Sequence, residues 1–252
     1  MLSASQQKFL TSLHVKKYRQ KYRKFIVEGD KLVAELLAQQ RIGVSAVYGL
    51  DTWAEARAAL LGPHQTKFVA VTMAELKKIS ALTTPNQVLA VADMPADSDA
   101  PPAAPAGKAF YLDGIQDPGN MGTILRIADW FGLRPVYCSP DSVDPYSPKV
   151  VQAGMGAVLR VPVIETTLEA ILDAAPDLPV LGADMDGADV FQALLPRQGL
   201  LIIGNEGKGI SAGAAARISA RVSIPRPAGG AAESLNAAVA AGILAAVWVN
   251  AR

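Results

Sequence analysis

The chain has 252 residues, which is long enough for one large domain or two modest domains with separate hydrophobic cores. Half of the residues are hydrophobic and 19% are charged, which fits a soluble α/β protein, and the net charge of +1 does not by itself indicate a nucleic-acid partner. A single cysteine excludes an internal disulfide, and two histidines give no obvious zinc cluster. We therefore expect a cytoplasmic, reduced protein without a metal ion.

The apolar segments do not indicate membrane association. The longest of them, Ala237–Val249, is too short and too rich in alanine for a membrane span. Residues Met1–Lys8 lack the apolar run of a signal peptide. We expect no membrane partner.

Residues 1–94 alternate predicted strands and helices, a pattern typical of a small α/β/α domain. The predicted strands are Lys24–Glu28, Ser45–Leu50, Lys67–Val71 and Gln87–Ala92. The predicted helices are Lys31–Gln40, Trp53–Leu61 and Met73–Leu82. Asp30 stands where it can cap the first of these helices.

The beginning of this region is strongly basic, and Tyr18 and Tyr22 are interleaved with its cations. The cations that we expect to bind RNA are Lys16, Lys17, Arg19, Lys21, Arg23 and Lys24. Lysine and arginine suit a phosphate backbone, and the aromatic rings offer faces for unstacked bases. The alternative is a solvated helix face that keeps this end of the chain soluble, and the sequence leaves both open.

Residues 95–107 are small, rich in proline and without periodicity, which predicts a linker. After it, at residues 108–252, the alternation of strands and helices begins again. Strands are predicted at Ala109–Leu112, Pro135–Cys138, Leu159–Ile164, Val180–Ala183, Leu200–Ile203 and Arg221–Ile224. Helices are predicted at Met121–Phe131, Lys149–Gly154, Leu168–Ala174 and Leu235–Val249. Strands separated by helices indicate a mostly parallel sheet covered on both faces.

Three polar segments of residues 108–252 stand where a predicted strand runs into a loop and a helix. They are Asp117-Pro118-Gly119-Asn120-Met121-Gly122-Thr123-Ile124-Leu125-Arg126, Gly204-Asn205-Glu206-Gly207-Lys208-Gly209 and Ser234-Leu235-Asn236. Such junctions open on the same edge of a parallel sheet, where ligands bind. The second segment matches neither a P-loop nor a dinucleotide fingerprint.

Each polar residue of these segments also has an ordinary structural interpretation. Asn120 and Ser234 can be helix N-caps, Arg126 a surface cation and Glu206 a residue of a tight turn. The order of all three segments favours a site over these separate explanations, because one motif alone would be weak and three in series are specific.

The order and spacing of the three segments resemble the SpoU (TrmH-like) RNA 2′-O-ribose methyltransferases of the SPOUT superfamily, over residues 108–252. The resemblance implies a carboxyl-terminal trefoil knot, S-adenosylmethionine as cofactor and a homodimer formed through this domain. It assigns catalysis to Asn120, Arg126, Glu206, Ser234 and Asn236. It assigns cofactor binding to Ala183, Asp184, Gly204, Asn205, Gly207, Ile224, Pro225 and Leu235.

Two further features bear on this resemblance. The segment from Lys17 to Gly29 resembles the beginning of the L30e-like RNA-binding domain that precedes the catalytic domain in many SpoU enzymes. The chain departs from the family pattern by Ala237-Ala238 after Asn236 and by a long, glycine-containing stretch from Arg226 to Glu233. These departures concern the fine geometry of the site more than its chemistry.

The expected function is therefore methylation of a ribose 2′-hydroxyl in RNA, with ribosomal RNA as the expected substrate. Because a guanidinium is effectively always protonated, we expect Arg126 to bind the ribose-phosphate and stabilise the forming alkoxide. The alternatives are a tRNA-directed methyltransferase, a non-catalytic RNA-binding or ribosome-assembly protein, and a nucleotide-dependent oxidoreductase. The missing glycine fingerprint argues against the last. A fragment beginning near Lys108 is expected to keep cofactor binding.

Overall fold

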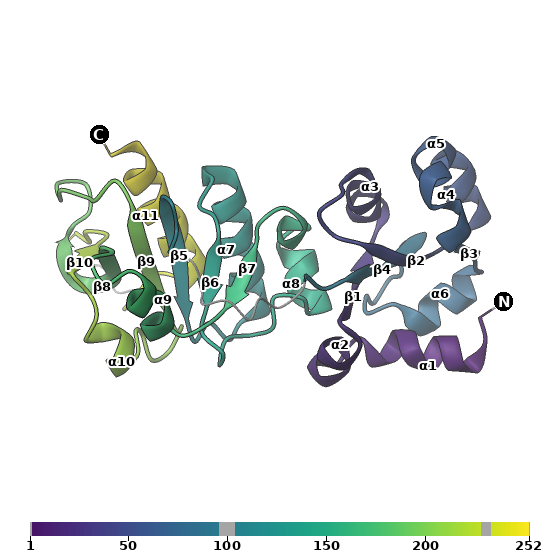
Figure 1. The fold of residues 1–252 in the computed structure, drawn as a ribbon, viewed down its shortest axis with the longest axis horizontal. Coiled ribbons are helices and arrows are strands. Elements are labelled where there is room, and N and C mark those ends of the chain that lie inside the picture. Colours follow the sequence, from purple (N-terminus) through teal and green to yellow (C-terminus); the bar gives the residue numbers. More distant parts are fainter. Residues whose placement is uncertain (1, 96–103, 228–232, 252) are drawn as a thin grey trace. The chain divides into compact units, whose positions relative to one another are not determined.

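The structure, a computed structural model, describes residues 2–95, 104–227 and 233–251. The chain forms two compact units, which are drawn in Figure 1. The first unit contains Met1–Asp97 together with Tyr146–Leu159, and the second contains Ser98–Pro145 together with Arg160–Arg252. Most of the predicted linker, residues 96–103, lies outside the described residues.

The first unit is built on a four-stranded sheet in the order β1-β4-β2-β3. Its strands are β1 (Lys24–Glu28), β2 (Val44–Gly49), β3 (Phe68–Ala70) and β4 (Val88–Asp93). Strand β4 pairs antiparallel with both β1 and β2, whereas β2 and β3 are parallel. All four predicted strands are present, with ends that differ from the prediction by at most one residue.

Short helices surround this sheet. They are α1 (Ala4–Ser12), α2 (Lys16–Tyr22), α3 (Asp30–Ala38), α4 (Asp51–Ala56), α5 (Ala58–Leu61), the 3₁₀ helix η1 (Gly62–Lys67) and α6 (Met73–Ile79). The helix predicted over Trp53–Leu61 is two helices, because the backbone leaves the helical conformation at Arg57.

The predicted role of Asp30 as a helix cap is wrong. Helix α3 begins at Asp30 itself, and its N-cap is Gly29, at φ +107°, without a side-chain hydrogen bond. The Asp30 carboxylate instead accepts hydrogen bonds from Trp53 Nε1 at 2.8 Å and from the Arg57 guanidinium at 2.6 and 2.9 Å. These long-range partners hold the carboxylate away from the backbone of its own helix.

Tyr146–Leu159 packs within the first unit, although the sequence places it in the second domain. It contains α8 (Pro148–Ala153) and the 3₁₀ helix η2 (Ala157–Leu159). The ring of Tyr146 lies 4.9 Å from that of Phe25, and Gln152 Nε2 donates to the carbonyl of Glu28 at 2.8 Å. The chain therefore crosses between the units again after β6 and before β7.

The second unit is built on a six-stranded sheet in the order β10-β8-β9-β5-β6-β7, and all its neighbouring strands are parallel. The strands are β5 (Lys108–Asp113), β6 (Val136–Cys138), β7 (Val163–Glu165), β8 (Val180–Asp189), β9 (Gly199–Gly204) and β10 (Ala220–Ser223). The predicted parallel α/β fold is confirmed. Strand β7 begins later than predicted, because residues 157–159 form η2.

Helices cover both faces of this sheet (Figure 1). They are α7 (Pro118–Phe131), α9 (Leu168–Ala174), α10 (Ala212–Ala215) and α11 (Ala237–Asn250). Tyr111 of β5 shares one core with α9 and α10. Lys108 stands three residues earlier in β5 and therefore on the opposite face; it donates to the Trp248 carbonyl of α11, and α11 packs on α7. None of the helices in the described part of the chain is long and apolar enough to cross a membrane.

Candidate active site

The site lies where two central strands end side by side. Asp113, the last residue of β5, is the register partner of Gly204, the last residue of β9. The loop that enters α7 and the Gly204–Gly209 loop therefore start from adjacent positions. The Asp113 carboxylate also accepts a hydrogen bond from the backbone N–H of Ser211 at 2.6 Å, which fixes the far end of the second loop.

Glu206 occupies the centre of this edge. Its carboxylate accepts hydrogen bonds from Asn120 Nδ2 at 2.9 Å, from the N–H of Asp117 at 3.1 Å and from the N–H of Gln116 at 3.3 Å. Burial by itself raises the pKa of Glu206, but these hydrogen bonds outweigh it and lower the pKa below its ordinary value. Glu206 is therefore an anion at neutral pH, held at the amino-terminal end of α7, where the helix dipole favours negative charge.

Asn120 links Glu206 to the third polar segment. Its Oδ1 accepts a hydrogen bond from Asn236 Nδ2 at 2.8 Å, and its side chain is buried, with 7% exposure. Asn236 Oδ1 in turn accepts from the N–H groups of Ala238 and Val239 at the start of α11. A continuous chain of hydrogen bonds thus joins residues from all three segments, which are far apart in the sequence.

The two predicted helix caps are corrected by this arrangement. Asp117, not Asn120, caps α7, through a 2.8 Å hydrogen bond from the Asn120 N–H to Asp117 Oδ1. Asn236, not Ser234, caps α11, and Ser234 lies exposed two residues before it. Because Asp117 satisfies the helix terminus, the amide of Asn120 is left for its two side-chain partners.

The Gly204–Gly209 loop is closed by Asn205. Its Nδ2 donates to the carbonyl of Gly114 at 2.7 Å, and its Oδ1 accepts from the N–H groups of Gly207 and Lys208 at 2.9 and 3.0 Å. A Cβ at Gly204 would come within 2.4 Å of the Gly209 backbone, and Gly209 has φ +68°. Both glycines are thus required by the turn itself, while the open side of Gly209 leaves room for a ligand.

The other residues predicted to bind the cofactor lie on or after β8 and β10. Ala183 and Asp184 belong to β8, where the Asp184 carboxylate pairs with Arg221 of β10. A hydrogen bond from the Asp186 backbone lowers the pKa of Asp184, and the bond from Arg221 lowers it further, against the opposing effect of burial. Ile224 is half-buried and Pro225 is exposed. Residues 228–232, with the predicted Gly229-Gly230 departure, lie outside the described residues.

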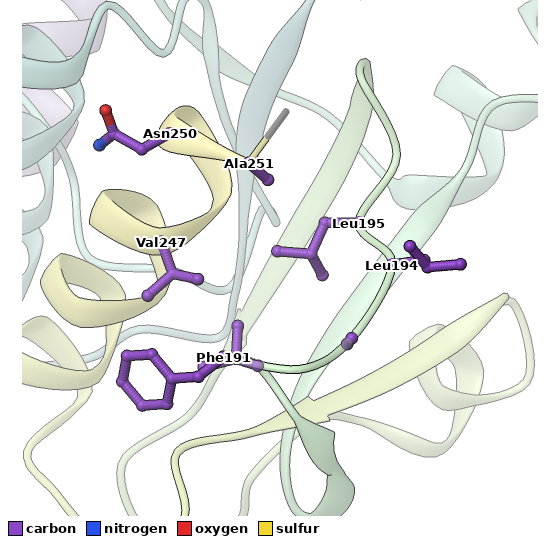
Figure 2. Close-up of a pocket in the computed structure, with 8 residues that line it drawn as sticks. Phe191, Leu194, Leu195, Val247, Asn250 and Ala251 are labelled. Carbon is purple, nitrogen blue, oxygen red and sulfur yellow. The ribbon is translucent and has the colours of Figure 1, made fainter.

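A separate hollow of about 390 Å³ lies at the other end of α11 (Figure 2). It is lined by Val190, Phe191, Ala193, Leu194, Leu195, Val247, Asn250 and Ala251. Its residues on α11, Val247 and Asn250, lie in the last turns of this helix, about 16–21 Å along the axis from the capping Asn236. The hollow is therefore not part of the hydrogen-bonded cluster around Glu206.

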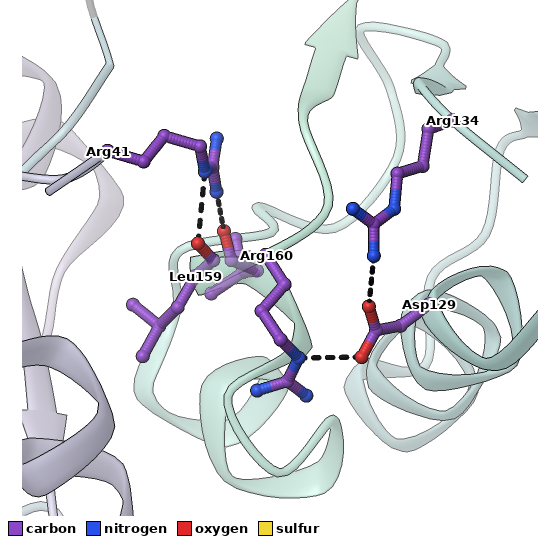
Figure 3. A network of polar contacts seen from close by, with 6 residues as sticks. Arg41, Asp129, Arg134, Leu159 and Arg160 are labelled. Carbon is purple, nitrogen blue, oxygen red and sulfur yellow. Dashed lines mark hydrogen bonds and ion pairs between the residues drawn. The ribbon is translucent and has the colours of Figure 1, made fainter. Parts of the chain in front are cut away.

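Arg126 lies in α7, two turns from Asp117, and its side chain is exposed. Among the described residues, no hydrogen bond or ion pair holds its guanidinium. Asp129, a candidate structural partner, is paired with Arg134 and Arg160, each at 2.6 Å (Figure 3). The Glu206 carboxylate is bonded to amide groups. Arg126 is thus available to an external ligand, although it does not bond to the Glu206–Asn120–Asn236 chain.

The predicted RNA-binding cations divide into exposed and structural groups. Lys17 and Lys21 are exposed on α2, and Lys16 is half-buried at its first turn. Their aromatic neighbours are ordered, because the rings of Tyr18 and Tyr22 stack with centroids 6.3 Å apart.

Three members of the predicted set have structural partners instead. Arg19 is a correction: its side chain is buried, with 2% exposure, and donates to the carbonyl of Leu13 at 2.8 Å. Lys24 forms an ion pair with Asp93 at 2.6 Å, and Arg23 ends α2 in the left-handed conformation and donates to a backbone carbonyl. The exposed basic face therefore consists of Lys17 and Lys21, with the half-buried Lys16 beside them.

Comparison with known families gives this geometry its context. Residues 108–246, more than half of the chain, match the SpoU rRNA Methylase family. The chain belongs to the SpoU rRNA methylase family. Residues 5–90 match the MRM3-like substrate binding domain. The resemblance drawn from the three segments is confirmed, and the matched region contains all three.

Relatives in the SpoU family share nearly the whole chain. The 23S rRNA (guanosine(2553)-2'-O)-methyltransferase RlmP of Bacillus subtilis is 32% identical over 92% of this chain and 91% of its own length. A putative RNA methyltransferase of the TrmH family from Porphyromonas gingivalis has a similar structure, with a TM-score of 0.86, 42% identity and 98% coverage of both chains. AviRb from Streptomyces viridochromogenes, solved with AdoMet, has a TM-score of 0.82 and 27% identity, covering 98% of this chain and 97% of its own.

Sequence reasoning missed three residues that hold this SpoU site together. Asp113 fixes the loop after β9, and the backbone N–H groups of Gln116 and Asp117 bind Glu206. The cap by Asp117 could have been read from the sequence, since an aspartate directly before proline and a helix is a frequent N-cap signal. Asp113 and Gln116 carry no such signal, because their partners are distant along the chain.

Proposed function

We propose that this chain methylates a ribose 2′-hydroxyl of ribosomal RNA, with S-adenosylmethionine as the methyl donor. The observation that carries the proposal is the hydrogen-bonded chain Glu206–Asn120–Asn236, which joins the three family segments at one edge of the sheet. The relatives named as 23S rRNA 2'-O-methyltransferases and the relative solved with AdoMet support the substrate class and the cofactor.

The residues at this edge fit S-adenosylmethionine. The exposed backbone of Gly207 and the open side of Gly209 can receive its polar groups, and Ile224 and Leu235 offer partly exposed apolar surface. Gly204 and Asn205 shape the loop, and we assign Ala183, Asp184 and Pro225 to its outer wall. When bound, S-adenosylmethionine supplies a methyl group activated by the sulfonium.

The side chains divide the remaining work. Arg126, exposed and without a protein partner among the described residues, binds the ribose-phosphate and stabilises charge that develops on the 2′-oxygen. Glu206 holds Asn120 in place and, with its lowered pKa, is a weak proton acceptor. Asn236 holds the start of α11 against Asn120 through its hydrogen bond, and we place the exposed Ser234 at the edge of the site. Positioning accounts for most of the rate in such a displacement.

The two units divide RNA recognition and chemistry in this proposal. Residues 1–94 bind RNA through the face formed by Lys16, Lys17 and Lys21, residues 95–107 connect the two domains, and residues 108–252 carry the chemistry. An enzyme that modifies ribosomal RNA acts where ribosomes are assembled, which agrees with the cytoplasmic location expected from the sequence.

We also infer that the second unit forms a homodimer through α11. This helix is apolar on nearly all sides, yet its Val239 is 51% exposed, and Leu235, which directly precedes the N-cap Asn236, is 49% exposed. A twofold contact would cover them. Sedimentation of the parent chain and of Val239→Asp tests this: we expect a dimer for the parent and a monomer for the variant, and a monomeric parent would contradict the inference.

The function is tested with the full chain. Calorimetry should detect S-adenosylmethionine binding and no NAD binding, and methyl-labelled cofactor should label unmodified 23S rRNA at ribose. Transfer should be lost in Arg126→Ala with stability unchanged, because the side chain leaves no cavity and alanine is the better helix former. Arg126→Lys should recover little, since lysine lacks the planar fork. Arg197→Ala, at another exposed arginine, is the control.

Two results would contradict the proposal. Binding of S-adenosylmethionine without transfer to any RNA would leave a non-catalytic RNA-binding protein. Near-parental transfer by Arg126→Ala would remove that residue from the site.

A further inference from the structure

Trp130 is unusual among the three tryptophans of the chain. Its side chain is 84% exposed, whereas Trp53 and Trp248 are buried, with 2% and 1% exposure. The indole is the largest aromatic side chain, and at this exposure most of its ring face is accessible to a planar ligand. Trp130 belongs to α7, and its exposure does not arise from a loose chain end.

Trp130 lies on the same helix face as Arg126. The two residues are four positions apart in α7, which places their side chains one turn apart, and both are exposed. The proposed function sets Arg126 against the target ribose. A ligand that extends along α7 from that ribose therefore meets the indole next.

Arginine side chains gather at this part of α7. Asp129 is the adjacent residue, and its carboxylate is shared by Arg134 and Arg160, at 2.6 Å each (Figure 3). The side chains of these two arginines are 47% and 34% exposed, so they remain accessible from solvent. Arg126 lies one turn before Trp130, and two more guanidinium groups meet at the carboxylate of the next residue, so this part of the helix favours a polyanionic ligand.

We propose that Trp130 stacks on an unpaired RNA base next to the target nucleotide, while Arg134 and Arg160 attract the adjoining phosphates. This inference rests on the proposed function. Aromatic faces bind unstacked bases of any sequence, and flanking arginines follow the backbone. A second copy of the chain is the less favoured ligand, because the exposed apolar residues of α11 offer a surface without this concentration of cations.

Intrinsic fluorescence tests the proposal directly, because all three tryptophans lie in the described part of the chain and, of these, Trp130 alone is exposed. A single-stranded RNA 12-mer of mixed sequence should quench the long-wavelength emission of the full chain at low salt. Inorganic polyphosphate should bind without equal quenching, since it has phosphates but no bases. A duplex of the same sequence should quench less than the single strand.

Three variants separate stacking from charge. Trp130→Ala should weaken binding of the single strand by about tenfold, in keeping with the usual contribution of one stacked base. Trp130→Phe should bind within a few-fold of the parent and show no quenching. Phe191→Ala, at an aromatic residue that is 60% exposed beside Asp189, is the matched control and should leave affinity unchanged.

The inference is overturned if Trp130→Ala binds the single strand as the parent does, or if polyphosphate quenches equally. It is also overturned if Trp130→Ala changes the oligomeric state in sedimentation, which would assign the indole to contact between copies. The proposed function fails separately, when the parent transfers no methyl group although its RNA binding and quenching are intact.

Discussion

The most informative substitution at the site is Asn120→Asp. The two side chains have nearly the same shape, and aspartate still accepts the hydrogen bond from Asn236 Nδ2. The change therefore alters only the contact with Glu206, where an N–H donor at 2.9 Å is replaced by a carboxylate oxygen. A favourable charge-assisted hydrogen bond becomes a repulsion between two anions.

The expected loss of stability follows from these two effects. A hydrogen bond to a charged group contributes about 1.5–3 kcal/mol, and we take the lower end because Glu206 is partly exposed. The repulsion, screened by solvent, adds about 1–2 kcal/mol. A total of about 3 kcal/mol should lower the apparent Tm by about 6–12 °C for a unit of this size.

The pH dependence has a definite sign. In the parent the lowered pKa of Glu206 means that its stabilising effect is present above the ordinary pKa of 4.5 and is lost as pH falls through the folded-state value. In Asn120→Asp one carboxyl of the pair must have a raised pKa, so its penalty decreases as protons bind. The Tm difference between variant and parent should therefore shrink as pH falls from 7 towards about 5.

Differential scanning calorimetry at several pH values measures this difference. Asn250→Asp is the control, since it makes the same isosteric change at the exposed end of α11, where Asn250 donates only to a helix carbonyl. It should cost no more than about 1 kcal/mol, from the unfavourable charge at a helix carboxyl terminus. A Tm difference for Asn120→Asp that is small, or that grows as pH falls, would refute the assigned role of Asn120.

Two other predictions concern the basic face of the first unit and the removal of residues 1–107. Charge reversal at Lys17 and Lys21 should weaken RNA affinity and flatten its salt dependence without changing cofactor affinity. The same reversal at Lys77 and Lys78 on α6 is the control and should leave RNA affinity unchanged. Equal RNA binding by the parent and the Lys17/Lys21 variant would mean that these lysines are only a solvated helix face. A fragment beginning at residue 108 should fail to fold cooperatively, because Tyr146–Leu159 would lose its partners in the first unit. A sharp thermal transition of this fragment together with intact cofactor binding would contradict the prediction.

The fold was largely predictable because hydrophobic periodicity reflects local geometry. Helix α9 occupies Leu168–Ala174 as predicted, and β1 occupies Lys24–Glu28. The convergence of Asn120, Glu206 and Asn236 followed from the rule that parallel strands open on one edge, and the structure brings the three residues together. The trefoil knot stays a prediction from the resemblance, since periodicity carries no information about threading.

The failures concern contacts that no local pattern encodes. In the sequence Arg19 cannot be told apart from its exposed lysine neighbours, but its guanidinium is buried and donates a hydrogen bond to the Leu13 carbonyl. The segment Tyr146–Leu159 follows β6 in the chain and packs with β1, through the Phe25–Tyr146 rings, in a way that only tertiary structure reveals. That packing is the reason why we now expect a fragment of residues 108–252 not to fold by itself.

The bonding roles of Asn120 and Asn236 explain why asparagine stands at both positions. At Asn236, Oδ1 caps α11 while Nδ2 donates to Asn120, so the side chain must carry an acceptor and a donor at once. At Asn120, Oδ1 receives that donor while Nδ2 holds Glu206. Aspartate lacks the donor, and serine is too short to serve both partners. The start of α11 is therefore tied to the loop after β9 through two amides, and a change at either one shifts the other.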